Sequence, residues 1–493
     1  MGEIAAPFAL AVGAYVLLVI GVGVASTRRA GRSPEEFFLA GRGLGSAVLF
    51  MALFGTNCTA FVLVGIPGRA YHDGIGVFGL NAPIVALGIP LSFWAIGVPA
   101  RRMAHRIGAL TPAELYAKSL GSRGVGVLLF AFFTLYTVPY MVTAVDGAAR
   151  ALEEVAGVES AMGGGMVLAL ALLYTSLGGM RATAWTNVIQ GALFMAFMAL
   201  AFVGVSSSLG GLTASMERVR ELAPERLVRP DTGLFEPRAF ASWSIAISAT
   251  VIAFPHMLVR LFTARDEKTL RTICRLYPVA LVALWLPAVM LGVWGAAEFP
   301  GLVGPESDAI FAKMVLEHLP AWGAAAGFLA VLAAVMSTLD AQLLTLGSML
   351  CRDVLPRGGD ASDLRDVRLG RAFSILVGLA VLAVWHFSGD SIFSLASISF
   401  SGYVTLVPLL LLGVRWRRLT PAGAMASMIA GNAAYLGSIA ASSAPLERAA
   451  LSPSLLGFLP VVWGLLAAAL AAVVVSGVTS RDEALAARAF GEA

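Results

Sequence analysis

Two adjacent hydroxyl residues and a carboxylate stand in the middle of a long apolar stretch of this chain. Ser337, Thr338 and Asp340 lie within the segment 321–350, which is otherwise largely apolar. Polar groups are costly at such a depth in hydrocarbon and usually mark the path of an ion or a polar solute. Hydroxyl oxygens suit a hard cation that must bind and also leave. We therefore expect this segment to serve transport across a membrane.

Polar residues also interrupt two other apolar segments. The segment 46–67 carries the run Gly-Thr-Asn-Cys-Thr at 55–59, and the segment 240–260 carries several hydroxyls ahead of Pro255. Glycine weakens a helix, and short polar side chains offer the backbone other hydrogen-bond partners. Interrupted helices expose carbonyls and helix ends that can bind a solute at mid-membrane. We predict one broken helix in each segment.

Packing is the alternative explanation for such residues. Serine, threonine and glycine are common where membrane helices pack closely, so an isolated hydroxyl usually reflects helix contact rather than binding. Two interruptions at matching places favour binding. Asp340 keeps two interpretations, a gate or proton path and a capping residue near the cytoplasm.

The composition of the chain indicates one integral membrane domain over residues 1–493. Hydrophobic residues make up 58% and charged residues 13%, and the mean hydropathy is +0.83. Soluble proteins carry about 25% charged residues. The basic residues occur in small clusters between apolar segments, which excludes a nucleic-acid surface. The five histidines are scattered, and we find no metal-ligand spacing or nucleophile motif, so we expect no enzyme.

Apolar segments of roughly 18 to 25 residues define the expected membrane spans. There are thirteen, near 7–25, 46–67, 75–99, 124–145, 161–177, 185–207, 240–260, 276–297, 321–350, 370–387, 392–413, 421–441 and 455–477. Most of the 34 basic residues fall in alternate loops. The positive-inside rule then places the N-terminus outside and the C-terminus in the cytoplasm, as expected for a multi-pass protein of the cell (inner) membrane. The long loop 208–239 should be external, with one amphipathic turn or helix.

Four local motifs carry a resemblance to a known family. They are EFFLAGRGLG at 36–45, GIPGRAY at 65–71, YTSLGGMRATAWTNVIQ at 174–190 and AAVMSTLDAQLL at 333–344, and PHMLVR at 255–260 also fits. In this order they resemble the sodium:solute symporter family, which includes proline, pantothenate, monocarboxylate and sugar symporters. The resemblance implies an all-α membrane protein with a LeuT-type core of two inverted five-helix repeats. Here the repeats would be 46–207 and 240–413, preceded by the span 7–25 and followed by two spans in 421–477.

The resemblance also implies a sodium site between the first and eighth core helices. Its ligands would be the carbonyl oxygens of Gly55, Cys58 and Ala334 and the hydroxyls of Ser337 and Thr338. Sodium bound there would draw the two helices together and close a gate, which would couple the sodium gradient to solute import by alternating access.

Two residues depart from the family pattern. Asn57 stands where proline-type members have an acidic residue, and its surroundings resemble the monocarboxylate-type branch. Asn187 stands where most members have aspartate. An amide lacks the charge that a second cation site or a sodium exit route would use. We assign Asn187 and Asp340 to coupling or gating.

The resemblance gives the solute site only in outline. Its candidates lie on the two broken helices and on the third and tenth core helices: Asn57, Thr59, Tyr140, Thr143, Trp243, Ser244, Ser248, Ser397 and Ser401. None is a cation, but a helix N-terminus and hydroxyls can hold a carboxylate. We expect a sodium-coupled symporter of a small monocarboxylate or related organic acid. A proline-like amino acid or sugar symporter, a proton-coupled transporter and a transporter-like nutrient sensor remain open. The expected partners are Na⁺, the solute and membrane lipid, with no nucleic acid and no obligatory protein partner.

Overall fold

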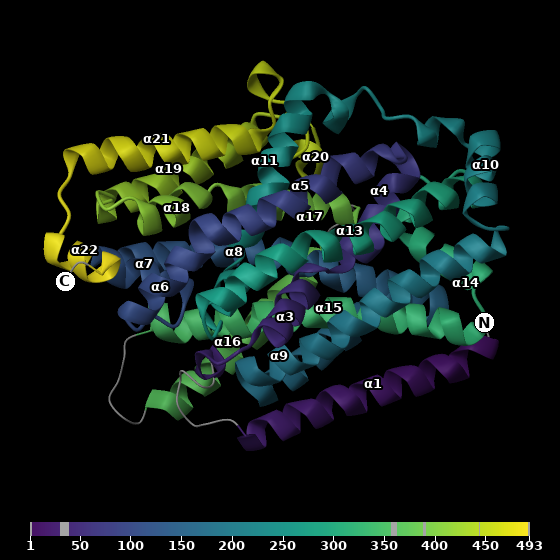
Figure 1. Cartoon of the computed structure of the whole chain (residues 1–493), viewed down its shortest axis with the longest axis horizontal. Coiled ribbons are helices and arrows are strands. Elements are labelled where there is room, and N and C mark those ends of the chain that lie inside the picture. Colours follow the sequence, from purple (N-terminus) through teal and green to yellow (C-terminus); the bar gives the residue numbers. More distant parts are fainter. Residues whose placement is uncertain (1, 30–38, 356–361, 388–390, 443, 492–493) are drawn as a thin grey trace.

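The computed structural model describes residues 2–29, 39–355, 362–387, 391–442 and 444–491. Within these ranges the chain is helical, and one isolated bridge between Leu44 and Ala264 is its only β-type pairing. Most long helices run along the long axis of the molecule (Figure 1). The N-terminus, α10 (Leu212–Leu222) and α14 (Ile310–His318) lie at one end of that axis, here called the N-terminal end. The opposite, C-terminal end carries α6 (Val98–Arg106), α7 (Pro112–Leu120) and α22 (Glu483–Phe490).

Both predicted breaks are confirmed. The first lies between α3 (Ser46–Asn57) and the helix Phe61–Asp73, made of the π-helical turn η2 (Phe61–Gly65) and α4 (Ile66–Asp73), with a bend of 56°. The second lies between α11 (Pro237–Ala253) and α12 (Pro255–Phe262), with a bend of 51°.

The sequence explains the second break directly. Phe254 is extended, with φ −67° and ψ 120°. A residue that precedes proline is disfavoured in the helical region, so α11 ends there. Pro255 then begins α12, because the first helical position needs no backbone N–H donor. At the first break, Cys58 is likewise extended.

The described residues contain further helices besides the four short 3₁₀ turns η1 (Ala40–Arg42), η4 (Pro224–Leu227), η5 (Gly233–Phe235) and η8 (Leu455–Gly457). They are α1 (Gly2–Arg29), α5 (Gly76–Ser92), η3 (Phe93–Gly97), α8 (Arg123–Ala156), α9 (Ser160–Ser208), α13 (Glu267–Glu298), η6 (Gly304–Ala309), α15 (Ala321–Met349), η7 (Leu350–Val354), α16 (Ser362–Phe387), α17 (Ile392–Val404), α18 (Val407–Arg415), α19 (Pro421–Ala440), α20 (Leu446–Ala449) and α21 (Pro460–Val478). As expected, 321–350 forms one long helix, and α10 is the helix of the loop 208–239.

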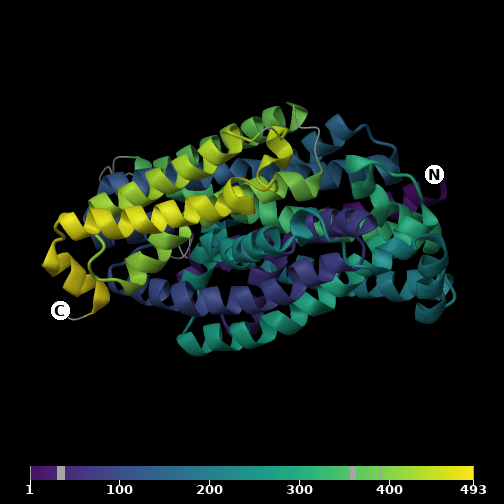
Figure 2. The same cartoon turned by 90° about the horizontal axis from the view of Figure 1, so that it is seen from above.

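The count of spans differs from the expected thirteen. By length and composition, the described residues contain eight membrane-spanning helices, or ten when each bent pair is one span. The other three expected spans are helical but fall short. Pro7–Val22 and Ser160–Leu173 are shorter apolar helices, and the long α19 is not among the candidate spans. Small residues explain the result for α19, which lies side by side with α21 (Figure 2). A Cβ added at Gly431 of α19 would lie 2.7 Å from the Ala468 side chain of α21. Close helix packing favours small residues such as glycine, which contribute little to the mean hydropathy.

The two broken helices are held by similar contacts. A Cβ at Gly292 of α13 would lie 2.2 Å from the Pro67 carbonyl oxygen of α4. A Cβ at Gly88 of α5 would lie 2.3 Å from the Ser248 side chain of α11. In each case the helix that follows one broken helix in sequence crosses the other broken helix at a glycine, because no larger residue fits there.

Candidate functional site

Ser337 and Thr338 of α15 contact the end of α3 at the first break. The Ser337 Oγ lies 2.7 Å from the Gly55 carbonyl oxygen and 2.7 Å from that of Ala334. The Thr338 Oγ1 lies 3.0 Å from the Thr56 carbonyl oxygen and 3.2 Å from that of Ala334. Five oxygen atoms therefore meet in a buried space between α3 and α15.

The break in the first helix creates this cluster. Carbonyls in the last turn of a helix have no partner within it. Gly55 and Thr56 would accept from the amides of Thr59 and Ala60, but the helix ends at Asn57. The two hydroxyls of α15 occupy these carbonyls instead. If the hydroxyls turn their lone pairs inward, the same five oxygens can surround a hard monovalent cation.

Hydrogen bonds bring four of the five expected sodium ligands together here. The groups of Gly55, Ala334, Ser337 and Thr338 converge. Among the described hydrogen bonds, none joins the Cys58 carbonyl to this cluster. The Thr56 carbonyl takes part instead, a group that the sequence analysis did not include.

Asn187 of α9 lies against the oxygen cluster. Its side-chain Nδ2 donates to the Thr56 Oγ1 at 2.8 Å and to the Ser337 carbonyl at 3.1 Å. A Cβ at Gly55 would lie 2.8 Å from the Asn187 carbonyl oxygen, so α3 and α9 are in close backbone contact. The amide thus ties α3, α9 and α15 together at the cluster.

Asp340 occupies a different environment from the hydroxyl pair. It is fully buried and close enough to Tyr15 of α1 to affect that residue electrostatically. The Tyr15 hydroxyl accepts a hydrogen bond of 2.6 Å from Gln190 of α9. Asp340 therefore belongs to a polar group shared by α1, α9 and α15, and the described hydrogen bonds do not link it to the oxygen cluster.

A buried arginine of the second broken helix lies next to the cluster. Arg260 is 1% exposed and belongs to α12, all of whose residues are buried. Its Nη1 donates to the Ala52 carbonyl at 3.1 Å. The Thr56 hydroxyl donates to the same carbonyl at 2.8 Å. Arg260 therefore supports the turn of α3 next to the cluster, a contact between the two broken helices.

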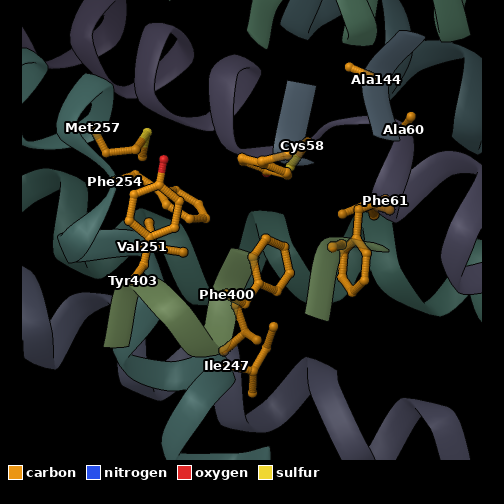
Figure 3. Packing of buried hydrophobic residues seen from close by; sticks show 14 of the residues in the cluster. Cys58, Ala60, Phe61, Ala144, Ile247, Val251, Phe254, Met257, Phe400 and Tyr403 are labelled. Atoms are coloured by element: carbon orange, nitrogen blue, oxygen red, sulfur yellow. The ribbon is translucent and has the colours of Figure 1, made fainter. Parts of the chain in front are cut away.

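A small central pocket lies beside both breaks. Its lining is mainly apolar, with five aromatic side chains, and includes Asn57, Phe61, Tyr140, Thr250, Phe254, Trp285 and Phe400. Figure 3 shows the rings of Phe61, Phe400 and Phe254 with Ile247 and Val251 of α11 around this region. The volume is about 20 Å³, room for about one water molecule. An organic solute would fit here only if the surrounding helices moved apart.

Two of the nine expected solute-site residues, Asn57 and Tyr140, line this pocket. The others have different environments. Four hydroxyls donate to carbonyls of their own helices: Thr143, Ser244, Ser248 and Ser397. The Trp243 Nε1 donates to Asn81, and the Thr59 hydroxyl accepts from the Phe61 amide. Ser401 lies beside Tyr435. The lining is thus aromatic rather than rich in hydroxyls. The aromatic residues that stand next to each break in the sequence could have identified this lining.

Trp285 also lines this pocket, although it is not among the residues expected from the sequence. The residue is 2% exposed, and its indole N–H is buried without a hydrogen-bond partner among the described residues. Buried tryptophan N–H groups usually find a partner. An acceptor on a bound solute would supply one.

Comparisons with known proteins identify relatives over almost the whole chain. A model of the sodium:solute symporter family matches residues 37–431. The chain is 29% identical over 477 residues to the sodium/pantothenate symporter of Escherichia coli (strain K12), covering 94% of each chain. It is 26% identical to the sodium/proline symporter of Staphylococcus aureus (strain JH9), covering 85% of this chain and 83% of the relative.

Solved structures share the fold. A sodium-coupled sialic acid symporter, in its substrate-bound outward-open state, matches with a TM-score of 0.78 at 16% identity, covering 96% of this chain and 98% of the other. MHP1, a nucleobase-cation-symport-1 family transporter in a closed conformation, matches with a TM-score of 0.59 at 16% identity, covering 93% and 99%. The expected LeuT-type helical fold is confirmed.

Proposed function

Because this chain belongs to the sodium:solute symporter family and is a sodium-coupled membrane transporter rather than an enzyme, we propose that it imports a small organic monocarboxylate with one sodium ion. The observation that carries this proposal is the contact of Ser337 and Thr338 with the carbonyls of Gly55 and Thr56. We assign the sodium site to this oxygen cluster, with the Ala334 carbonyl as the fifth ligand. Neutral oxygens hold one monovalent ion without trapping it.

Two observations support a carboxylate as the solute. The relatives carry pantothenate and proline, and both molecules contain one carboxylate group. In the central pocket, the unpartnered indole N–H of Trp285 and the side chains of Asn57 and Tyr140 are polar groups that can contact it. The N-terminal ends of η2 and α12 begin beside the same pocket, at Phe61 and next to Phe254, and favour a negative group.

Coupling follows from the position of the cluster. Asn57, the last residue of α3, lines the central pocket, and Gly55 and Thr56 of the same turn contact α15. Sodium bound between α3 and α15 would fix the end of α3 and therefore the shape of the pocket. A solute that fits this shape binds more tightly when sodium is present. We assign Asn187 to this coupling, and Asp340 to a gate between α1, α9 and α15.

The arrangement of the chain in the membrane is part of the proposal. The repeats would comprise 46–207 and 240–413, supported by the glycine contacts of Gly88 and Gly292 across the two broken helices. The distribution of basic residues supports an external N-terminus and a cytoplasmic C-terminus in the inner membrane. Reporter fusions after α1 and after α21 would test both orientations. The N-terminal end of Figure 1 is then the outer face.

Uptake into proteoliposomes tests the function. We expect an inward Na⁺ gradient to drive uptake of pantothenate or of a short monocarboxylate such as lactate, and to do so better than uptake of the corresponding amides. Uptake that is unchanged when K⁺ replaces Na⁺ at constant pH would contradict sodium coupling. Preferential uptake of proline would instead assign an amino acid as the solute, and uptake driven by a pH gradient alone would assign proton coupling.

A further inference from the structure

The elements that line a larger pocket of about 500 Å³, among them α4 and α20, lie between the middle of the molecule and its N-terminal end (Figure 1). The pocket is formed where the end of α4, η6, the start of α17 and the segment around α20 meet. Its lining includes Arg69, His72, Asp308, Ser394 and Arg448. Under the proposed orientation this pocket faces the outside, where a solute arrives.

Arg69 places a positive charge in this pocket. The guanidinium lies 2.5 Å from the Asp73 carboxylate, one turn further along α4. Its Nε is buried without a hydrogen-bond partner among the described residues. A guanidinium carries five N–H donors in a fork that matches a carboxylate, so one arginine can serve a second carboxylate as well as Asp73. Arg448 adds a second cation to the lining.

Asp308 is the acidic residue of the lining, and its carboxylate already accepts a hydrogen bond. Its Oδ2 accepts the Ile392 amide at 2.9 Å, at the start of α17. The side chain is 2% exposed and lies against Gly68, where an added Cβ would come within 2.6 Å of Oδ1. Burial raises the pKa of Asp308 to about 7, so this carboxyl is partly neutral at neutral pH and repels an anion weakly.

Two stacked aromatic side chains connect the lining of this pocket to that of the central one. The guanidinium of Arg69 lies 5.2 Å from the ring centroid of Phe393. The same ring is stacked on Phe61, at 5.3 Å between centroids, and packs against Trp243 at 5.3 Å. Phe393 lines the large pocket and Phe61 lines the central one. A group held by Arg69 would therefore lie at one end of this ring stack, whose other end, Phe61, lines the central pocket.

We propose that the large pocket is a receiving site for the carboxylate of an anionic solute, which Arg69 holds before Phe393 moves aside. The proposal rests on the proposed function, because it takes the solute to be a carboxylate. It adds a second binding position that precedes the central one. The central pocket has no arginine, lysine or histidine in its lining among the described residues. Arg69 thus supplies the attraction for anions that the central pocket lacks.

The charge of this pocket can be measured without knowing the solute. We would make the variant Ser394→Cys and treat intact cells with two membrane-impermeant methanethiosulfonates, one anionic and one cationic. Ser394 lines the pocket and is partly buried, and the unchanged chain controls for Cys274, the least buried of the native thiols. We expect the anionic reagent to react faster. Arg69→Gln should lower the ratio of anionic to cationic rates about tenfold, since loss of a nearby unit charge alters both rates in opposite directions.

Matched variants make the experiment specific. Arg69→Lys keeps the charge and should keep most of the ratio, which separates charge from misfolding. Arg220→Gln removes an exposed arginine of α10 that pairs with Glu217 outside the pocket, and should leave the ratio unchanged. Propionate in Na⁺ medium should slow the reaction of the thiol introduced by Ser394→Cys, whereas the neutral propionamide should not.

The outcomes separate this proposal from the proposed function. A ratio that is insensitive to Arg69→Gln, equal protection by propionate and propionamide, or an introduced thiol that does not react from outside would each overturn the receiving site. None of these readouts needs transport. Sodium-driven carboxylate uptake with an insensitive ratio would contradict the receiving site alone. Carboxylates that protect the introduced thiol but are not taken up would support the receiving site and contradict the proposed solute.

Discussion

The hydroxyl of Ser337 lies 2.7 Å from the carbonyl oxygen of Gly55, a residue 282 positions earlier in the chain. The contact joins the middle of α15 to the last turn of α3, so that one repeat of the proposed core closes on the other. It exists because the broken helix leaves a carbonyl that needs a donor. Any movement that separates α3 from α15 must first replace this hydrogen bond.

Removing either hydroxyl should weaken sodium binding. We expect Ser337→Ala or Thr338→Ala to raise the Na⁺ concentration for half-maximal uptake by roughly ten- to a hundredfold, because loss of one oxygen ligand costs on the order of 1 to 3 kcal/mol. Ser348→Ala is the control: this buried serine of α15 donates to the Thr345 carbonyl of its own helix. If Ser348→Ala raised the Na⁺ concentration for half-maximal uptake equally, the assignment of the sodium site to Ser337 and Thr338 would lose its support.

Asn187 should set the sodium stoichiometry. With an amide at this place we expect one Na⁺ per solute and a Hill coefficient for Na⁺ near one, because a second buried cation would lack a compensating charge. Asn187→Asp loses the donor to Thr56 and Ser337 and adds a negative charge. We expect it to add a second cation dependence or to slow turnover by holding the ion. A wild-type charge-to-solute ratio that corresponds to two sodium ions, corrected for the solute's charge, would contradict this.

The indole N–H of Trp285 should contribute to solute binding. Trp285→Phe should raise the KM for a carboxylate solute roughly five- to tenfold, the effect of one lost hydrogen bond of about 1 kcal/mol, and should leave the Na⁺ dependence unchanged. Trp294→Phe is a matched control, because Trp294 also lies on α13 with a buried, unpartnered N–H but stacks on Phe202 outside the central pocket. A similar loss in both variants would indicate a packing effect.

Close contact between α3 and α9 should tolerate no side chain at Gly55. In Gly55→Ala the new Cβ would lie 2.8 Å from the Asn187 carbonyl oxygen, so the two helices must separate. We expect lower thermal stability and weaker Na⁺ dependence of uptake. Gly79→Ala on α5, which has open space around it, should change neither property. Normal sodium dependence in Gly55→Ala would show that the cluster does not depend on this contact.

Asp308 should make stability depend on pH. Its pKa is raised from 3.8 to about 7, mainly by burial, with Asp146 and Arg150 of α8 nearby and Arg69 and His72 lining the same pocket. The folded state therefore binds the proton more tightly than the unfolded chain. Its stabilising contribution is fully present below about pH 4 and is lost as the pH rises through 7.

Thermal melting in detergent between pH 5 and pH 8 measures this effect. The melting temperature of the wild-type protein should fall over this range, by an amount that corresponds to a few kcal/mol at most. Asp308→Asn should remove most of the slope, because the amide oxygen can still accept the Ile392 N–H. Asp231→Asn, at an exposed position, should keep the slope. An unchanged slope in Asp308→Asn would assign it to another group.

Local sequence determined where the helices are and where they break. Apolar length predicted the helical segments, and the run at 55–59 and the Phe-Pro pair at 254–255 predicted both breaks, because backbone hydrogen bonds in a helix reach only four residues. Hydropathy was a less reliable guide to the membrane span at α19, because this helix packs against its neighbour through small residues. The Ser337–Thr338 pair was visible for the same local reason: two hydroxyls stand out in an apolar helix.

Only the tertiary structure decided what these groups contact. Which carbonyl meets Thr338, which rings surround the central pocket and what Arg69 covers all depend on how each helix is rotated and how far it is shifted against its neighbours. Those quantities are set by packing between residues hundreds of positions apart, such as Gly292 against Pro67. The hydroxyls expected at the solute site illustrate this: Ser244 and Ser397 lie on the expected helices, but their side chains bond to their own backbones while aromatic residues face the pocket.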